Sequence, residues 1–202
     1  MSAAQPRRTQ AERREATTAK LLDATIECLA ELGYARTSVA AICSAAGLSQ
    51  GALFRHFPTR RDVIVAAADA IGQRDLEDFE AAVARLDPED YLSIVRLIRG
   101  ICRTPTHAAW HEIMVASRTD AELRDAAREG LLRFETMLIE ASARFFGVGR
   151  TVAERAAVVL LSVMHMFDSE AVTVVVLENE PLEQARIEWV AAMLERELGG
   201  LV

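Results

Sequence analysis

Apolar side chains recur at intervals of three and four residues along almost the whole chain, which is the spacing of one face of an α-helix. In residues 14–32, for example, Leu22, Ile26 and Leu29 share such a face. Glycine and proline interrupt the pattern at positions typical of helix ends, as at Gly33 and Pro181. The sequence therefore predicts an all-α fold of about nine helices.

One segment departs from this pattern in composition. Residues 171–177 read AVTVVVL, a run with the β-branched residues typical of strands. The run lies in phase with the helical pattern before it, and no partner strand is visible elsewhere. We therefore interpret it as buried helix.

Capping motifs predict several helix starts, including Thr37 or Ser38 and Ser49 before two short helices. Thr104-Pro105 and Asp87-Pro88 each place a capping residue before a proline at the first helical position. The pairs Thr119/Glu122 and Thr151/Glu154 match the spacing of the capping box. Thr59 is expected to cap the helix that starts near residue 60, with Asp62 in its first turn.

Charge is distributed unevenly along the chain. The net charge is −7, but residues 1–61 carry nine basic and five acidic side chains. No Asp or Glu occurs between Glu31 and Asp62. A carboxylate on a surface that faces phosphates would repel them, so this gap favours a polyanion-binding N-terminal end.

Other features exclude several classes of protein. The first 20 residues are polar and Arg-rich, unlike a secretory signal. The strongly apolar uncharged run at residues 156–167 is too short to span a bilayer, so we expect no membrane insertion. Three scattered cysteines indicate reduced thiols in a cytoplasmic protein.

Residues 42–57 carry the clearest functional pattern. A short apolar helix, a tight turn at Gly47 and a second helix starting at Ser49 form a helix-turn-helix. Such a second helix presents its N-terminal residues to base edges in the major groove, where Gln50 could pair with adenine and Arg55 with guanine or a phosphate. A purely structural helical hairpin is the alternative, and the acid-free gap favours DNA binding over it.

The residues expected to contact DNA combine groove-facing and phosphate-binding side chains. Gly51 keeps the second helix slim, so that its backbone can approach the bases closely. The full set comprises Thr37, Ser38, Ser49, Gln50, Gly51, Ala52, Phe54, Arg55, His56 and Arg60.

Residues 21–64 resemble the N-terminal domain of the tetracycline-repressor (TetR) family. The resemblance rests on Gly33-Tyr34, on Thr37-Ser38-Val39, and on the run AGLSQGALFRHF at 46–57. Two positions depart from the family's usual pattern. Arg60 stands where Lys is usual, and Phe54 stands where Tyr is frequent, so any phosphate contact by that hydroxyl is absent here.

The resemblance implies a helical C-terminal domain that dimerises and encloses a small-molecule pocket. Residues 109–124, AWHEIMVASRTDAELR, resemble a segment of that domain. The implied partners are a second copy, contacted through about 150–178 and 181–198, a pseudo-palindromic double-stranded DNA operator, and a small-molecule effector. Apolar residues in those helices independently allow a dimer: Val158, Leu161, Met164, Ala171, Val175, Val190, Met193 and Leu194.

Bulky side chains are candidates to line the pocket, and His107, Trp110 and His165 each combine a polar group with an apolar face. The set comprises His107, Trp110, Met114, Phe134, Met164 and His165. His107 and His111 also have a spacing that can bind metal, but no third ligand is evident, so we expect no metal and no cofactor. No nucleophile elbow or paired carboxylates are visible, so we expect no enzyme activity.

These observations divide the chain into a flexible basic arm at 1–12, a helix-turn-helix domain at 13–70 and a ligand-binding and dimerisation domain at 71–202. We expect a transcriptional repressor that leaves its operator when a small molecule binds. Two alternatives remain at this point: a DNA-binding protein whose core domain answers a protein partner, and a metal-dependent enzyme that uses His107 and His111.

Overall fold

The computed structural model describes residues 9–200, and within them it contains helices and no strand. The all-α prediction is therefore confirmed. In chain order the elements are α1 (Gln10–Leu32), a 3₁₀ turn η1 (Tyr34–Arg36), α2 (Val39–Ala46), α3 (Gln50–His56), α4 (Arg60–Val83), α5 (Tyr91–Cys102), α6 (Pro105–Ser117), α7 (Ala121–Phe146), α8 (Arg150–Val174) and α9 (Glu180–Leu198).

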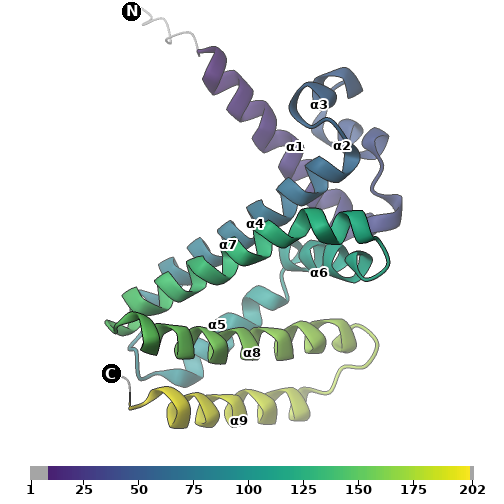
Figure 1. Ribbon diagram of the computed structural model, residues 1–202. Helices are drawn as coiled ribbons and strands as arrows, with labels where there is room; N and C mark the ends of the chain where they lie inside the picture. The colour runs from purple at the N-terminus through teal and green to yellow at the C-terminus, as the bar shows by residue number, and fades with distance from the viewer. Residues whose placement is uncertain (1–8, 201–202) are drawn as a thin grey trace, which may run out of the picture.

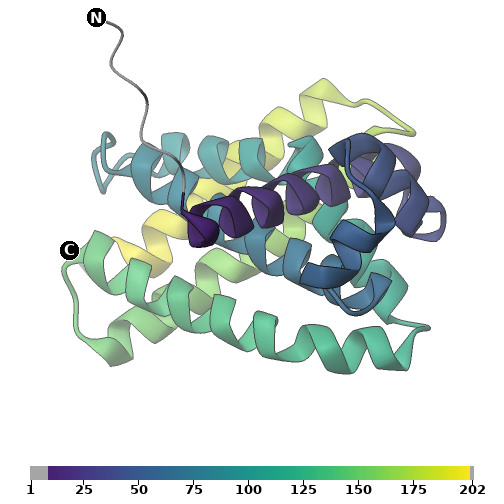
Figure 2. The ribbon, with the colours of Figure 1, turned by 90° about the horizontal axis from the view of Figure 1, so that it is seen from above.

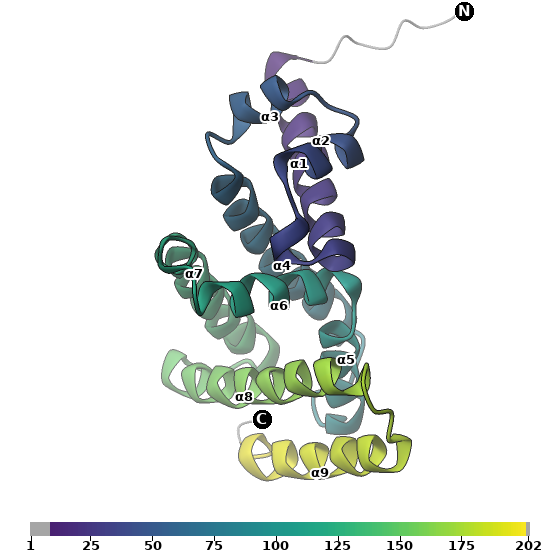
Figure 3. The ribbon, with the colours of Figure 1, turned by 90° about the vertical axis from the view of Figure 1, so that its right-hand side faces the viewer.

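The helices form a small head on a larger body. Figure 1 shows α2 and α3 beside α1 in the head, while α8 and α9 lie next to each other at the opposite end. The long helix α4 runs from the head into the body, where it lies along α7 (Figure 1). Turning the molecule shows the same division, with the head above α6 and the body below it (Figure 3).

Four buried apolar clusters hold these parts together, including a small one between α4, α7 and α8 that comprises Leu76, Leu138, Ala141 and Ala157. In the head, α1, α2, α3 and the start of α4 enclose Leu21, Ile42, Leu53 and Val63. A second cluster joins the head to the body, because α1 and α4 pack there against α6 and the start of α7; its buried members are Ile26, Leu29, Ile64, Ala67, Ala68, Ile71, Ala109, Ile113 and Leu123. The largest cluster lies between α5, α8 and α9. Head and body thus share an apolar joint, and α4 crosses residue 70 without a break.

A buried ion network also ties α8 and α9 to α5. Glu170 is almost fully buried and binds both Arg99 and Arg186. Arg99 also pairs with Glu183, which Arg103 contacts at 3.1 Å. Removing one member of such a network would leave a charge buried without its partner, so the network fixes how these helices pack.

The first helix starts earlier than expected. Thr9 caps α1 in a capping box with Glu12, so residues 10–12 are helical and do not belong to a flexible arm. This corrects the expected arm at 1–12. Its remaining part, including Arg7 and Arg8, lies outside the described residues, which begin at residue 9.

Four of the predicted helix caps are confirmed. Ser38, Ser49 and Thr104 each accept a hydrogen bond from the backbone three residues ahead, and Thr59 forms a capping box with Asp62. Glycine ends α1 and α2, and Gly47 adopts a left-handed conformation at φ +64°.

Three predicted helix starts are wrong by one to three residues. Asp120, rather than Thr119, caps α7 through the Leu123 amide, and a carboxylate accepts that bond readily. Thr151 lies inside α8, which starts after Gly149 without a side-chain cap. Asp87-Pro88 forms a turn, and α5 starts only at Tyr91 with Asp90 as its cap.

The AVTVVVL segment is helical only as far as Val174, and it is not buried. Helix α8 ends at Val174, and the residues that follow it are exposed, with Val176 at 89% of its possible surface. By length and composition, α8 is the one helix among the described residues that could span a membrane. Val163 and Phe167 of this helix are nevertheless fully buried against other helices of the chain.

Candidate nucleic-acid interface and ligand cavity

The second helix of the helix-turn-helix, α3, is held by its inner face and exposed on its outer face. Leu53 is fully buried in the head core, and Ser49 Oγ accepts a hydrogen bond from the Ala52 amide at 3.2 Å. Gln50 and Phe54 lie on the exposed side. Figures 1 and 3 place α3 at the opposite end of the molecule from α8 and α9, and Figure 2, seen from above, shows the head in front of the body.

Gly51 is not required by packing within the chain. A Cβ atom added there would meet only Ser49 Oγ, at 4.0 Å. The surface of α3 at Gly51 is therefore open and carries no side chain, so a DNA groove could approach the backbone closely there.

Two basic residues of α3 differ in their role. Arg55 is exposed, and its Nε donates only to the Gly51 carbonyl in the same helix, at 3.1 Å. His56 is half-buried, and its Nδ1 lies 2.9 Å from Thr18 Oγ1 of α1. His56 thus anchors α3 to α1, while Arg55 extends from the outer surface.

The prediction that the Thr37 side chain contacts DNA is wrong. Thr37 is completely buried, and its hydroxyl donates to the Gly33 carbonyl at 2.9 Å. The chain turns inward between η1 and α2, so Ser38 alone lies at the surface there.

Arg60 binds groups of the protein itself. Its Nε donates to the Thr37 carbonyl at 2.5 Å, and a terminal nitrogen donates to the Tyr34 carbonyl. The guanidinium also stacks over the Tyr34 ring. These contacts tie the first turn of α4 to the segment before α2, so the position of Arg60 is set inside the head.

Polar contacts cross the joint between head and body. The Tyr34 amide donates to Glu112 Oε2 of α6 at 2.9 Å, and the Tyr34 hydroxyl donates to Asp120 at 3.1 Å. Arg61 at the start of α4 pairs with Glu122 of α7. A shift of α6 or α7 would therefore be transmitted to the head.

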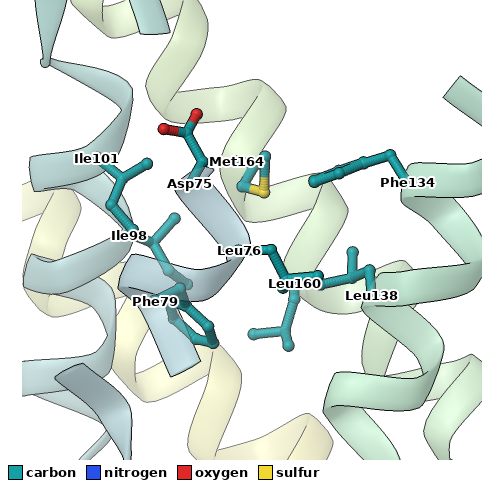
Figure 4. A pocket seen from close by; sticks show the side chains of 9 residues that line it. All are labelled: Asp75, Leu76, Phe79, Ile98, Ile101, Phe134, Leu138, Leu160 and Met164. Atoms are coloured by element: carbon teal, nitrogen blue, oxygen red, sulfur yellow. The ribbon is translucent and has the colours of Figure 1, made fainter. Parts of the chain in front are cut away.

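The body contains two adjoining cavities. The first, of about 30 Å³, has apolar walls apart from Asp75 (Figure 4); it is lined by Asp75, Leu76, Phe79, Ile98, Ile101, Phe134, Leu138, Leu160 and Met164. The second, of about 200 Å³, shares Asp75, Phe134 and Met164 with it. Figure 4 shows the Asp75 carboxylate at one end of the first cavity and apolar side chains around the rest.

The second cavity contains most of the expected pocket residues. Its walls include His107, Trp110, Phe134, Met164 and His165. Met114 is the exception, because it faces the joint between head and body and packs against the apolar cluster there.

A buried histidine lies between two carboxylates in the wall of this cavity. His107 Nδ1 is 2.7 Å from Asp75 Oδ2 of α4, and Nε2 is 2.6 Å from Asp168 Oδ1 of α8. Burial disfavours the charged imidazolium, but the hydrogen bonds to Asp168 and Asp75 outweigh it and raise the pKa of His107 to about 9. The ring is therefore positively charged at neutral pH.

The sequence shows no paired-carboxylate arrangement, but the structure brings Asp75 and Asp168 to the same histidine. Asp75 and Asp168 are far apart in the sequence, so no short-range spacing links them. One signal was available: Asp168 follows directly on an uncharged run of a buried helix. An acid at such a position needs a partner, but the sequence does not say which one.

Comparison with known proteins gives the family. Residues 21–74 match the family described as bacterial regulatory proteins, tetR family. Over 190 residues the chain is 37% identical to an uncharacterised HTH-type transcriptional regulator of Mycobacterium tuberculosis, covering 93% of this chain and 97% of the relative. The chain belongs to the TetR family of bacterial transcriptional regulators.

Solved structures agree with this family's fold. A transcriptional regulator from Rhodococcus sp. RHA1 superposes with a TM-score of 0.63 at 22% identity, over 89% of this chain and 96% of that one. The multidrug binding protein EbrR, solved with imidazole, gives a TM-score of 0.63 at 20% identity, with 96% of each chain covered. As a TetR-family member, the chain is a DNA-binding regulator of transcription, and the relatives it matches are described as transcriptional regulators.

Proposed function

We propose that this regulator is a cytoplasmic repressor that binds a pseudo-palindromic operator as a homodimer and leaves it when a small molecule enters the body. One observation carries the proposal. Helix α4 begins in the head, where Arg60 is fixed to the segment before α2, and reaches Asp75 and Leu76 in the cavity walls.

The exposed face of α3 is the proposed DNA contact. Gln50, Gly51 and Ala52 would approach base edges, Arg55 would reach a phosphate, and Ser38, Ser49, Phe54 and His56 would lie near the backbone. Arg60 would act mainly by positioning the head, because its donors are engaged within the protein.

The proposed dimer surface is an exposed apolar face of α8 and α9. Val158 and Trp189 are both more than half exposed, and Val175, Val176 and Leu182 extend the apolar surface along the two helices and their connection. Val190 and Leu194, which sequence analysis assigned to this surface, are buried in the protomer's own core. Two-fold symmetry would then present two α3 helices to adjacent turns of DNA.

The proposed effector is compact. The two cavities, of about 30 and 200 Å³, are small beside the roughly 300–1,000 Å³ of pockets for drug-sized ligands. A ligand that presses on Phe134 or Trp110 and displaces α4 would favour the released state. A coupling free energy of about 1–3 kcal/mol would change operator affinity about 5- to 150-fold. The description of EbrR as a multidrug binding protein supports a ligand-binding role for this fold.

Selection of bound DNA from a random pool tests the proposal. With the purified protein, we expect an enriched inverted repeat whose half-site centres lie about one helical turn apart. Affinity for it should fall steeply with salt. Failure to enrich any inverted repeat, or an enriched single half-site bound by a monomer, would contradict it.

A further inference from the structure

Three potential metal ligands from three helices converge in the body. Cys102 is the last residue of α5, His107 lies in the first turn of α6, and Asp168 lies on α8. One ligand atom from each residue lies within 4.8 Å of the other two. We propose that Cys102, His107 and Asp168 bind one divalent metal ion, with Zn²⁺ as the best match.

The backbone holds two of these ligands in place. Only Arg103 and Thr104 separate the end of α5 from the start of α6. Thr104 caps α6, because its Oγ1 accepts a hydrogen bond from the His107 amide at 3.1 Å. Cys102 and His107 are therefore fixed relative to each other before any metal arrives.

Asp75 supplies the outer contact that metal-binding histidines usually have. It lies 2.7 Å from His107 Nδ1, so it can accept a hydrogen bond from Nδ1–H and leave Nε2 facing Asp168 and Cys102. A carboxylate behind a histidine ligand fixes the ring and its tautomer.

Charge and ligand type favour zinc over magnesium or calcium. A thiolate, a carboxylate and a neutral imidazole together carry two negative charges, which a divalent ion neutralises. Binding displaces the Cys102 thiol proton and the Nε2 proton, as metal binding to such ligands does. Sulfur and nitrogen ligands suit Zn²⁺, whereas Mg²⁺ and Ca²⁺ take oxygen.

The cluster needs only a small adjustment to hold the ion. Nε2 and Asp168 Oδ1 are 2.6 Å apart in the described conformation. Tetrahedral coordination with bonds of about 2.0 Å would separate them to about 3.3 Å. A groove of about 620 Å³, lined in part by Cys102, His107 and Asp168, offers an entry path and room for a water or another ligand at the fourth position.

This site differs from the histidine pair suggested by the sequence. His111 also lines the groove, but it is not part of the converging cluster. His111→Gln is therefore a matched control: it removes a nearby imidazole and leaves the three proposed ligands intact.

The test uses the full-length, reduced and chelator-treated protein, titrated with Co²⁺ as a spectroscopic probe. We expect saturation near one Co²⁺ per chain, a thiolate-to-cobalt absorption in the near ultraviolet, and displacement by Zn²⁺. Cys102→Ser should lose that absorption, and His107→Gln should lose stoichiometric binding. Asp75→Asn should weaken binding about 10- to 100-fold. His111→Gln and Cys43→Ala should leave both the thiolate-to-cobalt absorption and the binding affinity unchanged.

A measurement on the wild-type protein covers the case in which a variant fails to fold. X-ray absorption at the zinc edge should show one sulfur neighbour at about 2.3 Å. The proposal would be overturned by the absence of saturable binding of Co²⁺ and Zn²⁺, by a zinc shell without sulfur, or by folded Cys102→Ser and His107→Gln variants that bind as the wild type does. None of these results bears on operator binding, which the proposed function requires independently.

Discussion

The guanidinium of Arg60 lies 4.4 Å from the centre of the Tyr34 ring. Together with its hydrogen bonds to the carbonyls of Tyr34 and Thr37, this contact fastens the start of α4 to the segment that leads into α2. An arginine that sequence analysis assigned to phosphate binding is therefore a structural part of the head.

Arg60→Ala should lower the stability of the protein as well as its affinity for DNA. Loss of the stacking contact and of two charged hydrogen bonds should reduce the free energy of unfolding by about 2–3 kcal/mol, measured by urea denaturation. The slope of log affinity against log salt should change by much less than the value of about 0.9 that one phosphate contact contributes.

Arg55→Ala is the control for this experiment. Arg55 is exposed, so its removal should leave stability nearly unchanged and reduce the salt slope by about one. The opposite pattern in the two variants would mean that Arg60, and not Arg55, is the phosphate contact.

Substitutions at Gly51 should separate DNA binding from folding. Open space surrounds this position, so Gly51→Ala should fold normally and gain up to about 1 kcal/mol of helix stability. Gly51→Asp should also fold, because an acid suits the first turn of a helix, but its carboxylate would face phosphates and abolish operator binding. Thermal melts and electrophoretic mobility shifts would measure the two effects, and tight operator binding by Gly51→Asp would contradict the docking of α3.

A charge on the exposed face of α9 should dissociate the dimer. Trp189→Asp should give a monomer in sedimentation experiments, with its helical content retained, because that side chain is 58% exposed in the protomer. Operator affinity should fall with it, since each monomer offers one α3. Leu132→Asp on α7 is a matched control at 53% exposure. If the Leu132 variant dissociates and the Trp189 variant does not, the dimer surface lies elsewhere.

Both carboxylates beside His107, those of Asp75 and Asp168, should contribute to the stability of the fold. In metal-free protein, Asp75→Asn or Asp168→Asn should reduce the free energy of unfolding by about 1–3 kcal/mol, because a buried imidazolium loses one charged partner. The loss of unfolding free energy in the double variant should differ from the sum of the two single losses, because both carboxylates contact the same imidazole ring. Asp78→Asn, exposed on the same helix as Asp75, should have almost no effect. Equal losses at Asp75 and Asp78 would exclude a special role for the buried contact.

The sequence by itself determined the local structure of this protein. Ser38, Ser49 and Thr59 cap their helices as expected, and Gly47 makes the turn, because each signal acts through backbone groups a few residues away. The all-α fold and the exposed face of α3 follow from the same short-range periodicity, and the resemblance over residues 21–64 indicated the family.

Only the tertiary structure decided which side chains meet. Thr37 is turned inward, and Arg60 donates to the backbone carbonyls of Tyr34 and Thr37. Val176 is exposed, although the apolar run around it suggested a buried position. Asp75, His107 and Asp168 come from three helices and meet in the body. A helical period tells which face a residue occupies, but the partner on the other side of that face depends on how distant helices pack, and no short-range pattern encodes that choice.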